Sequence, residues 1–235
     1  MQRCFHRRIQ ERIRTRKKRG KQMRKFMFND RCGLTTSVIQ KTKWKTRRIA
    51  SGVVHKWYVV EELSVFLENP TKRERALKEF ALKTCPIKVG EIIAVAQSYK
   101  DCGYEKRHDS SGSERILIDD SHHPYVRWHN IPMSAAWGNK MFAKAEYMPF
   151  RIKITGVDFE RLQDISYEDC MAEGIYKCHD VINSDKENVK CFTFPNTPHI
   201  YATPRDAFAA LIDKVSGKGT WESNPYVYVF TFELV

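Results

Sequence analysis

The chain has 235 residues, of which 42% are hydrophobic and 12% aromatic, so a buried core is expected and global disorder is not. No run of eighteen apolar residues occurs and no apolar segment follows the basic start, so we expect neither a membrane span nor a secretory signal. The formal net charge is +13, but residues 1–25 hold twelve Lys or Arg and one acid, Glu11. The other 210 residues carry only +2, so the charge belongs to the amino-terminal segment.

Residues 1–24 are expected to form a basic, flexible extension ahead of a single domain over 25–235. Such a charge favours nucleic acid or another acidic surface. Two alternatives stay open, namely a tail that becomes ordered only on a polyanion and an upstream extension ahead of a start at Met23 or Met27. The bases expected to contact nucleic acid are Arg12, Arg14, Arg16, Lys17, Lys18 and Arg19.

Apolar spacing, capping residues and breakers predict the elements of the domain. Asn29 and Ser166 are expected to cap helices, and Thr203 followed by Pro204 is a strong helix start. Gly156 interrupts a long alternating strand and predicts a bulge. In chain order we expect a strand at 25–28, a helix capped at 29–30 and running through 39, a basic strand at 43–49, an apolar, β-leaning segment at 53–68, a helix at 71–83, a strand at 92–96, a long loop at 100–124 with an edge strand at 115–118, a strand at 150–161, a helix at 166–174, irregular chain at 176–200, a helix at 203–217 and a strand at 226–234.

This series of elements predicts an α+β domain built around a small curved sheet or barrel. The seven cysteines include no Cys-x-x-Cys pair, which favours reduced thiols in a cytoplasmic protein. Cys178-His179, with Cys170 and Cys191 nearby, lacks the paired spacing of a zinc site. We therefore expect neither a metal nor a cofactor.

The segment 41–48 is the most chemically suggestive part of the chain, with five bases in eight positions. Alternate residues of a strand share a face, so Thr46 and Arg48 are expected to point the same way, with Lys43 near the start of the strand. A hydroxyl, an amine and a guanidinium would then meet one anionic or carbonyl-bearing ligand. The same pattern also fits a solvated or phosphate-binding face and ordinary β-propensity.

The order of the motifs resembles the ASCH domain, a family of PUA-like β-barrels. The chain departs from the family pattern at Lys41, where Gly is frequent, and at Trp44, where Thr is frequent. The resemblance implies a small PUA-like barrel with flanking helices and with insertions near 50–85 and 100–148, as in phage-type members. The matching pieces are Lys-x-x-Thr-x-Arg within 40–48, Val-Gly-Glu-Ile-Ile-Ala-Val at 89–95, Ile-x-Ile-Thr-x-Val and the acidic helix within 151–173, and Trp-x-x-Asn-Pro-x-Val-x-Val-x-x-Phe at 221–232.

PUA-like domains commonly bind RNA, so the resemblance implies a domain that binds RNA or a modified nucleoside through the basic strand. Cations would contact phosphate and an aromatic side chain would stack on a base. Trp44 is the best stacking candidate because it lies between cations. The expected ligand contacts are Lys41, Trp44, Lys45, Arg47 and Arg48.

Some small ASCH proteins are amidohydrolases that cleave N4-acetylcytidine with a Lys, a Thr and a Glu, and the resemblance places these on Lys43, Thr46 and Glu173. Acyl transfer to water needs a nucleophile, a base and positive charge near the oxyanion. Thr46 would be the nucleophile, Lys43 its base once burial lowers the pKa of the amine, and Glu173 an acid/base partner. Arg48 would hold the oxyanion or, bidentately, a carboxylate-like edge. A further alternative is a phage accessory protein that binds a protein partner through its insertions.

Overall fold

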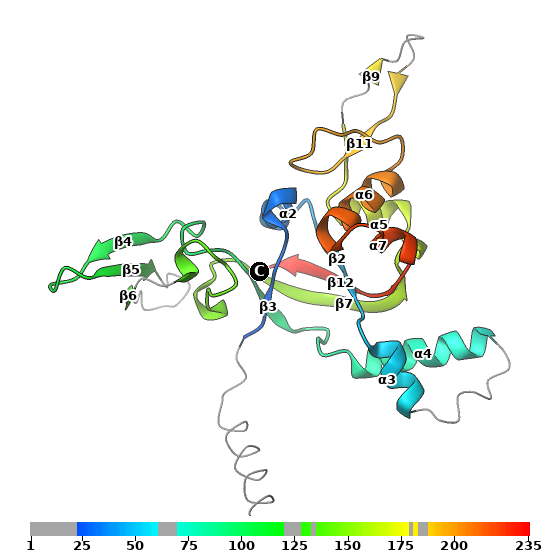
Figure 1. The fold of residues 1–235 in the computed structure, drawn as a ribbon, viewed down its shortest axis with the longest axis horizontal. Coiled ribbons are helices and arrows are strands. Elements are labelled where there is room, and N and C mark those ends of the chain that lie inside the picture. The colour runs from blue at the N-terminus through cyan, green and yellow to red at the C-terminus, as the bar shows by residue number, and fades with distance from the viewer. Residues whose placement is uncertain (1–22, 61–69, 120–127, 133–134, 179–180, 183–187) are drawn as a thin grey trace, which may run out of the picture.

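A five-stranded sheet lies at the centre of the computed structural model (Figure 1). The structure describes residues 23–60, 70–119, 128–132, 135–178, 181–182 and 188–235, so the predicted bases of the arm at 12–19 lie outside it. Neighbouring strands are antiparallel, except for the first pair, which is parallel. Across the sheet the order is β1 (Lys25–Phe26), β3 (Ile92–Val95), β7 (Arg151–Arg161), β12 (Tyr226–Leu234) and β2 (Lys45–Ile49).

The long strands β7 and β12 form the spine of the sheet. Four successive residues of β12, from Val227 to Phe230, are all buried, which shows that both faces of this strand are covered. The register of the pair shifts between Thr231 and Phe232, opposite Gly156 and Ile154. The bulge predicted at Gly156 is therefore confirmed.

Helices cover the two faces of the sheet. On one face, Arg47 of β2 lies over the Phe208 ring of α6, whereas Tyr228 of β12 donates from its hydroxyl to the Ala81 carbonyl of α4 on the other face. In Figure 1, α5, α6 and α7 lie on one side and α3 and α4 on the other. The helices are α2 (Leu34–Ile39), α3 (Val53–Val60), α4 (Pro70–Thr84), α5 (Tyr167–Ala172), α6 (Pro204–Ser216) and α7 (Thr220–Ser223). Among the described residues, none of the helices has the length and apolar character needed to cross a membrane.

The capping residues predicted from the sequence hold these helices. The Ser166 hydroxyl accepts a hydrogen bond from the Asp169 amide at 3.1 Å at the start of α5. Thr203 accepts in the same way from the Asp206 amide at the start of α6. Asn29 caps a 3-10 turn that directly precedes α2. These short-range signals are confirmed because each satisfies backbone N–H groups that a helix leaves unpaired at its first turn.

The segment that begins at residue 53 is helical, although its apolar β-branched residues favoured a strand. Val53 and Trp57 are both buried, and their spacing of four residues places them on one face of α3. Gly52, with φ of +73°, turns the chain into this helix. Tertiary burial of a helical stripe has here overridden local β-propensity.

The region expected to be a long loop is a three-stranded sheet that projects as an arm (Figure 1). The predicted edge strand at 115–118 lies instead in the middle of this sheet, because both of its sides are paired. A second hydrophobic cluster, which includes Tyr99, Ile116 and Met148, packs at the base of the arm. The strands are β4 (Glu105–His108), β5 (Glu114–Asp119) and β6 (Trp128–Pro132).

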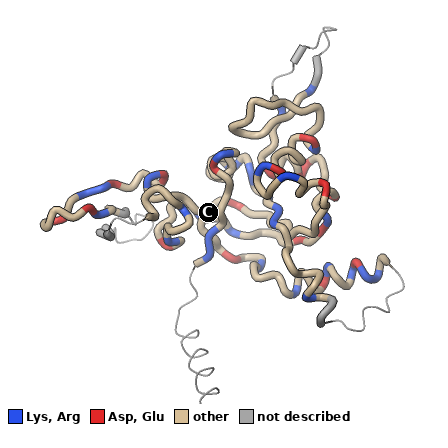
Figure 2. Tube along the Cα trace, viewed as in Figure 1, with Lys and Arg blue, Asp and Glu red and all other residues tan. Residues whose placement is uncertain are grey.

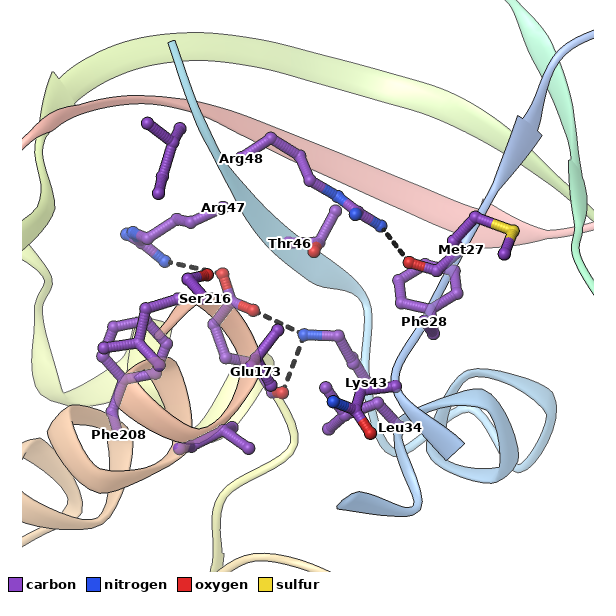
Figure 3. A pocket seen from close by; sticks show the side chains of 15 residues that line it. Met27, Phe28, Leu34, Lys43, Thr46, Arg47, Arg48, Glu173, Phe208 and Ser216 are labelled. Atoms are coloured by element: carbon purple, nitrogen blue, oxygen red, sulfur yellow. Dashed lines mark hydrogen bonds and ion pairs between the residues drawn. The ribbon is translucent and has the colours of Figure 1, made fainter. Parts of the chain in front are cut away.

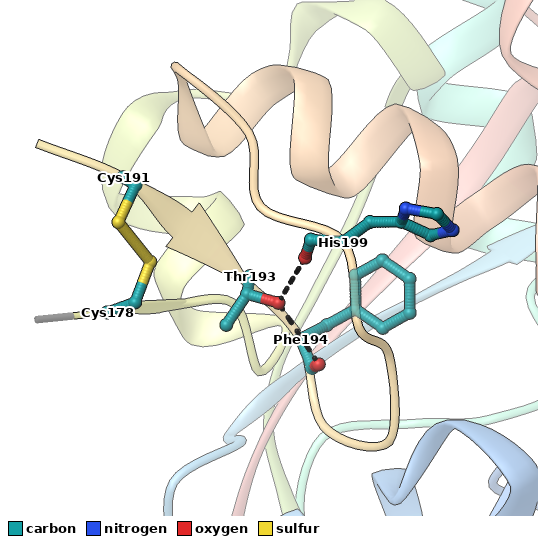
Figure 4. The surroundings of a disulfide bond; sticks show 5 residues. All are labelled: Cys178, Cys191, Thr193, Phe194 and His199. Carbon is teal, nitrogen blue, oxygen red and sulfur yellow. Dashed lines mark hydrogen bonds between the residues drawn. A yellow bond between two sulfur atoms is a disulfide. The ribbon is translucent and has the colours of Figure 1, made fainter. Parts of the chain in front are cut away.

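The segment after α5 forms two small hairpins, which the sequence analysis left irregular. β8 (Tyr176–Lys177) pairs with β11 (Phe192–Thr193), and β9 (Val181–Ile182) pairs with β10 (Asn188–Val189). Between them, a disulfide joins Cys178 and Cys191, whose Cα atoms are 5.6 Å apart (Figure 4). The expectation of reduced thiols is wrong for this pair, because antiparallel pairing brings together two cysteines that are 13 residues apart in sequence.

Candidate active site

A pocket of about 370 Å³ lies where β2 meets the end of α5 and one side of α6 (Figure 3). The three residues predicted to be catalytic, Lys43, Thr46 and Glu173, all line it. The other residues of its wall that matter for the chemistry are Phe28, Leu34, Arg47, Arg48, Phe208, Leu211 and Ile212. The pocket is thus a largely apolar cavity with a few polar groups at its base, which is the usual composition of a small-molecule site.

Lys43 and Glu173 form a buried ion pair at the base of the pocket. The two residues are only 2% and 4% exposed. The Lys43 amine donates to Oε2 of Glu173 at 2.5 Å and to the backbone carbonyl of the same residue at 2.7 Å. Glu173 is the C-cap residue directly after α5 (Tyr167–Ala172), and Gly174 follows it with φ of +100°. A residue with this φ is usually glycine. The turn leaves the backbone carbonyl oxygen and the Oε2 of Glu173 facing the Lys43 amine.

Arg47 holds the second oxygen of the Glu173 carboxylate, with 3.2 Å between Nη1 and Oε1. It is also buried, and its guanidinium donates to Asp169 at 2.6 Å and to Glu160 at 2.7 Å. Charge-assisted hydrogen bonds of this kind are stronger than neutral ones and fix geometry. Arg47, which was predicted to contact a ligand, lines the pocket and also orients the Glu173 carboxylate.

Thr46 lies on β2, opposite Phe230 of β12, and is 5% exposed. Within the described parts of the chain, its hydroxyl makes no hydrogen bond, whereas most buried polar groups have a partner. In Figure 3 the hydroxyl oxygen lies on the side of Thr46 that faces the Lys43 and Glu173 pair. The hydroxyl is therefore available to a molecule that enters the pocket.

Arg48 also lines the pocket, but its guanidinium reaches toward β1. It lies over the rings of Phe26 and Phe28, at 5.0 and 5.5 Å from their centroids, and donates to the Met27 carbonyl at 2.7 Å. Its Nε is buried and has no hydrogen-bond acceptor among the described residues. One donor of Arg48 is thus left over beside the pocket, where the oxyanion role was predicted.

The remaining residues of the predicted binding strand do not line the pocket. The Lys45 amine is paired with Asp169, and its side chain is 27% exposed. Trp44 is 46% exposed, and its backbone is anchored between α5 and β12 by hydrogen bonds to Ala172 and Phe232. Lys41 is exposed and lies in the turn before the strand. The structure therefore separates an inner set of site residues from an outer set at the surface.

Burial and neighbouring charges shift the pKa values of Lys43, Arg47 and Arg48. Burial lowers the pKa of the Lys43 amine, Glu173 opposes this, and the positive charges of Arg48 and Arg47 lower it further. Burial lowers the pKa of Arg48 as well. The pKa of Arg47 is raised despite its burial, because Glu173, Asp169 and Glu160 stabilise its charge. A lysine with a lowered pKa releases its proton more readily and so can serve as a general base.

Glu160 and Asp169 are the members of the site that the sequence analysis missed. Asp169 lies four residues before Glu173 on α5, so the two project from the same face, and this spacing was a readable signal. Glu160 lies on β7, 113 residues from Arg47, and no local pattern connects them. Both carboxylates belong to the network that holds Arg47 in place.

The chemistry of the site rests on its own geometry. Among the residues that the structure describes, no group of three or more His, Cys, Asp or Glu side chains is placed to hold a metal ion. In comparisons with known proteins, no family model, curated protein or solved structure matches this chain. A free hydroxyl, a buried amine and an oriented carboxylate around one cavity remain as the features from which a function is argued.

Proposed function

We propose that this pocket hydrolyses an amide, removing an acyl group from an N4-acylated cytidine. The observation that carries the proposal is the convergence of Lys43, Thr46 and Glu173 on one buried cavity, although Lys43 and Glu173 are 130 residues apart in sequence. These are the residue types and motif positions that the resemblance to ASCH amidohydrolases implies. A surface charge run would not bring a hydroxyl and a carboxylate to the same cavity.

In the first step, the Thr46 oxygen attacks the amide carbonyl carbon, and its proton passes to the neutral amine of Lys43. The amine becomes neutral when its extra proton passes to Glu173, whose Oε2 is in contact with it. The carbonyl oxygen becomes an oxyanion, which the unused Nε of Arg48 would stabilise. A preorganised donor of this type contributes most in a site shielded from water.

In the second step, the tetrahedral intermediate collapses and the bond between carbon and nitrogen breaks. The leaving amine takes the proton that Lys43 received, and the acyl group remains on Thr46 as an ester. Water then attacks the ester with neutral Lys43 as its base, which releases a carboxylic acid and restores the Thr46 hydroxyl. Amide and water are converted to acid and amine, and no other reactant is needed.

The size and charge of the site favour a nucleoside over an RNA strand. A volume of about 370 Å³ lies at the small end of the range for ligand pockets. Three of the five bases in 41–48, namely Lys43, Lys45 and Arg47, are already paired with protein carboxylates. They are therefore not free to neutralise successive phosphates, as binding to an RNA backbone requires.

RNA binding without hydrolysis is the second candidate, and the exposure of Trp44 favours it. This tryptophan is 46% exposed on the strand that leads to the pocket, near the unburied Lys41. A half-exposed tryptophan beside a cation suits stacking on an unpaired base. Substitution Trp44→Ala would then weaken RNA affinity, whereas the hydrolytic proposal assigns this residue no chemical role.

The same resemblance leads us to propose that the central sheet is curled in the manner of a PUA-like barrel. Its two outermost strands, β1 and β2, approach each other through Arg48, whose guanidinium lies over Phe26 and donates to Met27. The Phe26 ring also lies 5.5 Å from that of Phe230 on β12. These contacts link opposite edges of the sheet through its interior, as curling requires.

The direct test is to incubate the protein with N4-acetylcytidine and to measure released cytidine by chromatography. Thr46→Ala is expected to lower turnover by about 10³-fold or more, because the nucleophile is lost. Thr46→Ser keeps a hydroxyl and should retain measurable turnover, and a urea melt of each variant would show that it is folded. Absence of turnover in the wild type, or turnover that survives Thr46→Ala, would overturn the proposal.

A further inference from the structure

A second cavity, of about 350 Å³, adjoins the pocket. The two share Arg48 and Ile49, which line both. The second cavity has an aromatic wall made by Phe26, Tyr228 and Phe230. The second cavity therefore lies beside the proposed reaction site along β2, and the proposed reaction has no need of it.

The charges of the second cavity have one sign. Arg48 and Lys56 line it, and none of the described residues of its wall carries a carboxylate. Lys56 is exposed and forms no ion pair with any described residue. The positive charge of Arg48 acts on this cavity as well, whereas its Nε, which has no acceptor among those residues, is assigned to the oxyanion in the first pocket. By contrast, the first pocket includes Glu173, which forms ion pairs with Lys43 and Arg47.

The start of α3 adds to the positive potential. Ser51 and Val53, which lead into this eight-residue helix, line the second cavity. The first turn of a helix has the positive end of the helix dipole, which attracts anions, although the Val53 N–H itself donates to the Ala50 carbonyl at 3.3 Å. A Cβ atom placed on Gly52, between them, would meet no atom within 4 Å. The helix start is therefore open to a ligand.

We infer that the second cavity binds an anionic group, a carboxylate or a phosphate, of the same substrate whose amide reacts at Thr46. This inference rests on the proposed function and narrows its substrate class. The substrate is then an N4-acylated cytidine that carries a phosphate on its sugar, or one whose acyl chain ends in a carboxylate. Arg48 follows Thr46 by two residues, about 6.6 Å along a strand, so the anion lies close to the reacting amide.

The kinetic test compares three substrates, namely N4-acetylcytidine, its 5′-monophosphate and N4-succinylcytidine. We expect at least one anionic substrate to have a kcat/KM about tenfold or more above that of N4-acetylcytidine, and the preferred one identifies the source of the anion. Lys56→Glu should abolish the preference without lowering turnover of the neutral substrate. Lys100→Glu, the same change at an exposed lysine that lines neither cavity, should leave it intact.

A binding measurement separates failure of this inference from failure of the proposed function. Calorimetry with the Thr46→Ala variant would compare cytidine with cytidine 5′-monophosphate and with N4-succinylcytidine. Tighter binding of an anionic ligand that Lys56→Glu removes would support the anion site even if no hydrolysis occurs. Hydrolysis with equal use of neutral and anionic substrates, unaffected by Lys56→Glu, would overturn the anion site and leave the hydrolase standing.

Discussion

Two segments of the chain hold the same number of bases and have opposite structural roles. The segment 41–48 holds five Lys or Arg residues, and so does α4, over Pro70–Thr84. In the first, Lys43 and Arg47 are buried against carboxylates; in α4 the bases lie at the surface, interspersed with Glu74 and Glu79 (Figure 2). A run of charge therefore does not identify a site by itself.

The difference arises from the acids that other elements supply. Glu160 comes from β7, and Asp169 and Glu173 come from α5, so three carboxylates meet the buried side of the basic strand. In α4 only Leu77 and Ala81 are buried, and the charged residues follow the solvent side of the helix. Buried bases require such partners, because an unpaired charge away from water is costly.

The largest expected difference between the segment 41–48 and α4 is in how much the loss of one lysine lowers the free energy of unfolding. Lys43→Met leaves Glu173 buried with Arg47 alone and should destabilise the protein by about 3–5 kcal/mol, as loss of one partner of a buried pair does. Lys83→Met on α4 should change stability by about 0.5 kcal/mol or less. Urea unfolding measures both.

The double variant Lys43→Met/Glu173→Leu is the control for this contrast. It removes both charges, so most of the lost stability should return. A loss below about 1 kcal/mol for Lys43→Met alone would mean that the pair is not buried in solution as it is in the structure.

The second expected contrast is in the dependence of stability on pH. The folded pKa of Lys43 is lowered from 10.5 by burial, so the unfolded chain binds more protons between the folded pKa and 10.5. Stability from this group should therefore rise with pH in that window, by up to about 1.4 kcal/mol per pH unit, and should be lowest below it.

Unfolding measured between about pH 7 and 10 checks this sign. The difference between the wild type and the Lys43→Met/Glu173→Leu variant should grow in favour of the wild type as pH rises. The Lys83→Met variant should parallel the wild type throughout. A difference that shrinks with rising pH would show that the attraction of Glu173 outweighs burial.

The smallest expected contrast is between two outer ion pairs. Lys45 and Asp169 are 27% and 18% exposed, whereas Lys78 on α4 and its partner Asp158 are 45% and 50% exposed. Double-mutant cycles should give about 1 kcal/mol for the first pair and close to zero for the second, because solvent screens exposed charges. Equal coupling energies for the two pairs would show that the segment 41–48 and α4 do not differ in their partly exposed ion pairs.

Local signals predicted much of the fold. The caps at Ser166 and Thr203 and the bulge at Gly156 each depend on a few neighbouring residues, and each was readable. The helix that begins at Val53 could not be predicted in this way. Its β-branched residues favour a strand, and the burial of Trp57 is known only from the structure. The three-stranded arm was also missed, since pairing between polar strands leaves little trace in hydrophobic spacing.

The structure brings the residues of the predicted site together, but the sequence did not reveal how they are connected. Lys43, Thr46 and Glu173 were named through the order of the motifs, and the structure gathers them in one pocket. The partners of Arg47 lie 113 to 126 residues away in sequence. Such contacts depend on how β7, α5 and β2 are assembled, which a single sequence does not state.

One contact of the site joins the side chain and the backbone of the same residue. The Lys43 amine donates to both the side-chain carboxylate and the main-chain carbonyl of Glu173, so a single residue accepts two hydrogen bonds from it. Shortening the side chain by one methylene, as in Glu173→Asp, would move the carboxylate away from the Lys43 amine, whereas the contact with the backbone carbonyl would stay. At this position we expect the length of the side chain to matter as much as its charge, so that aspartate does not replace the glutamate.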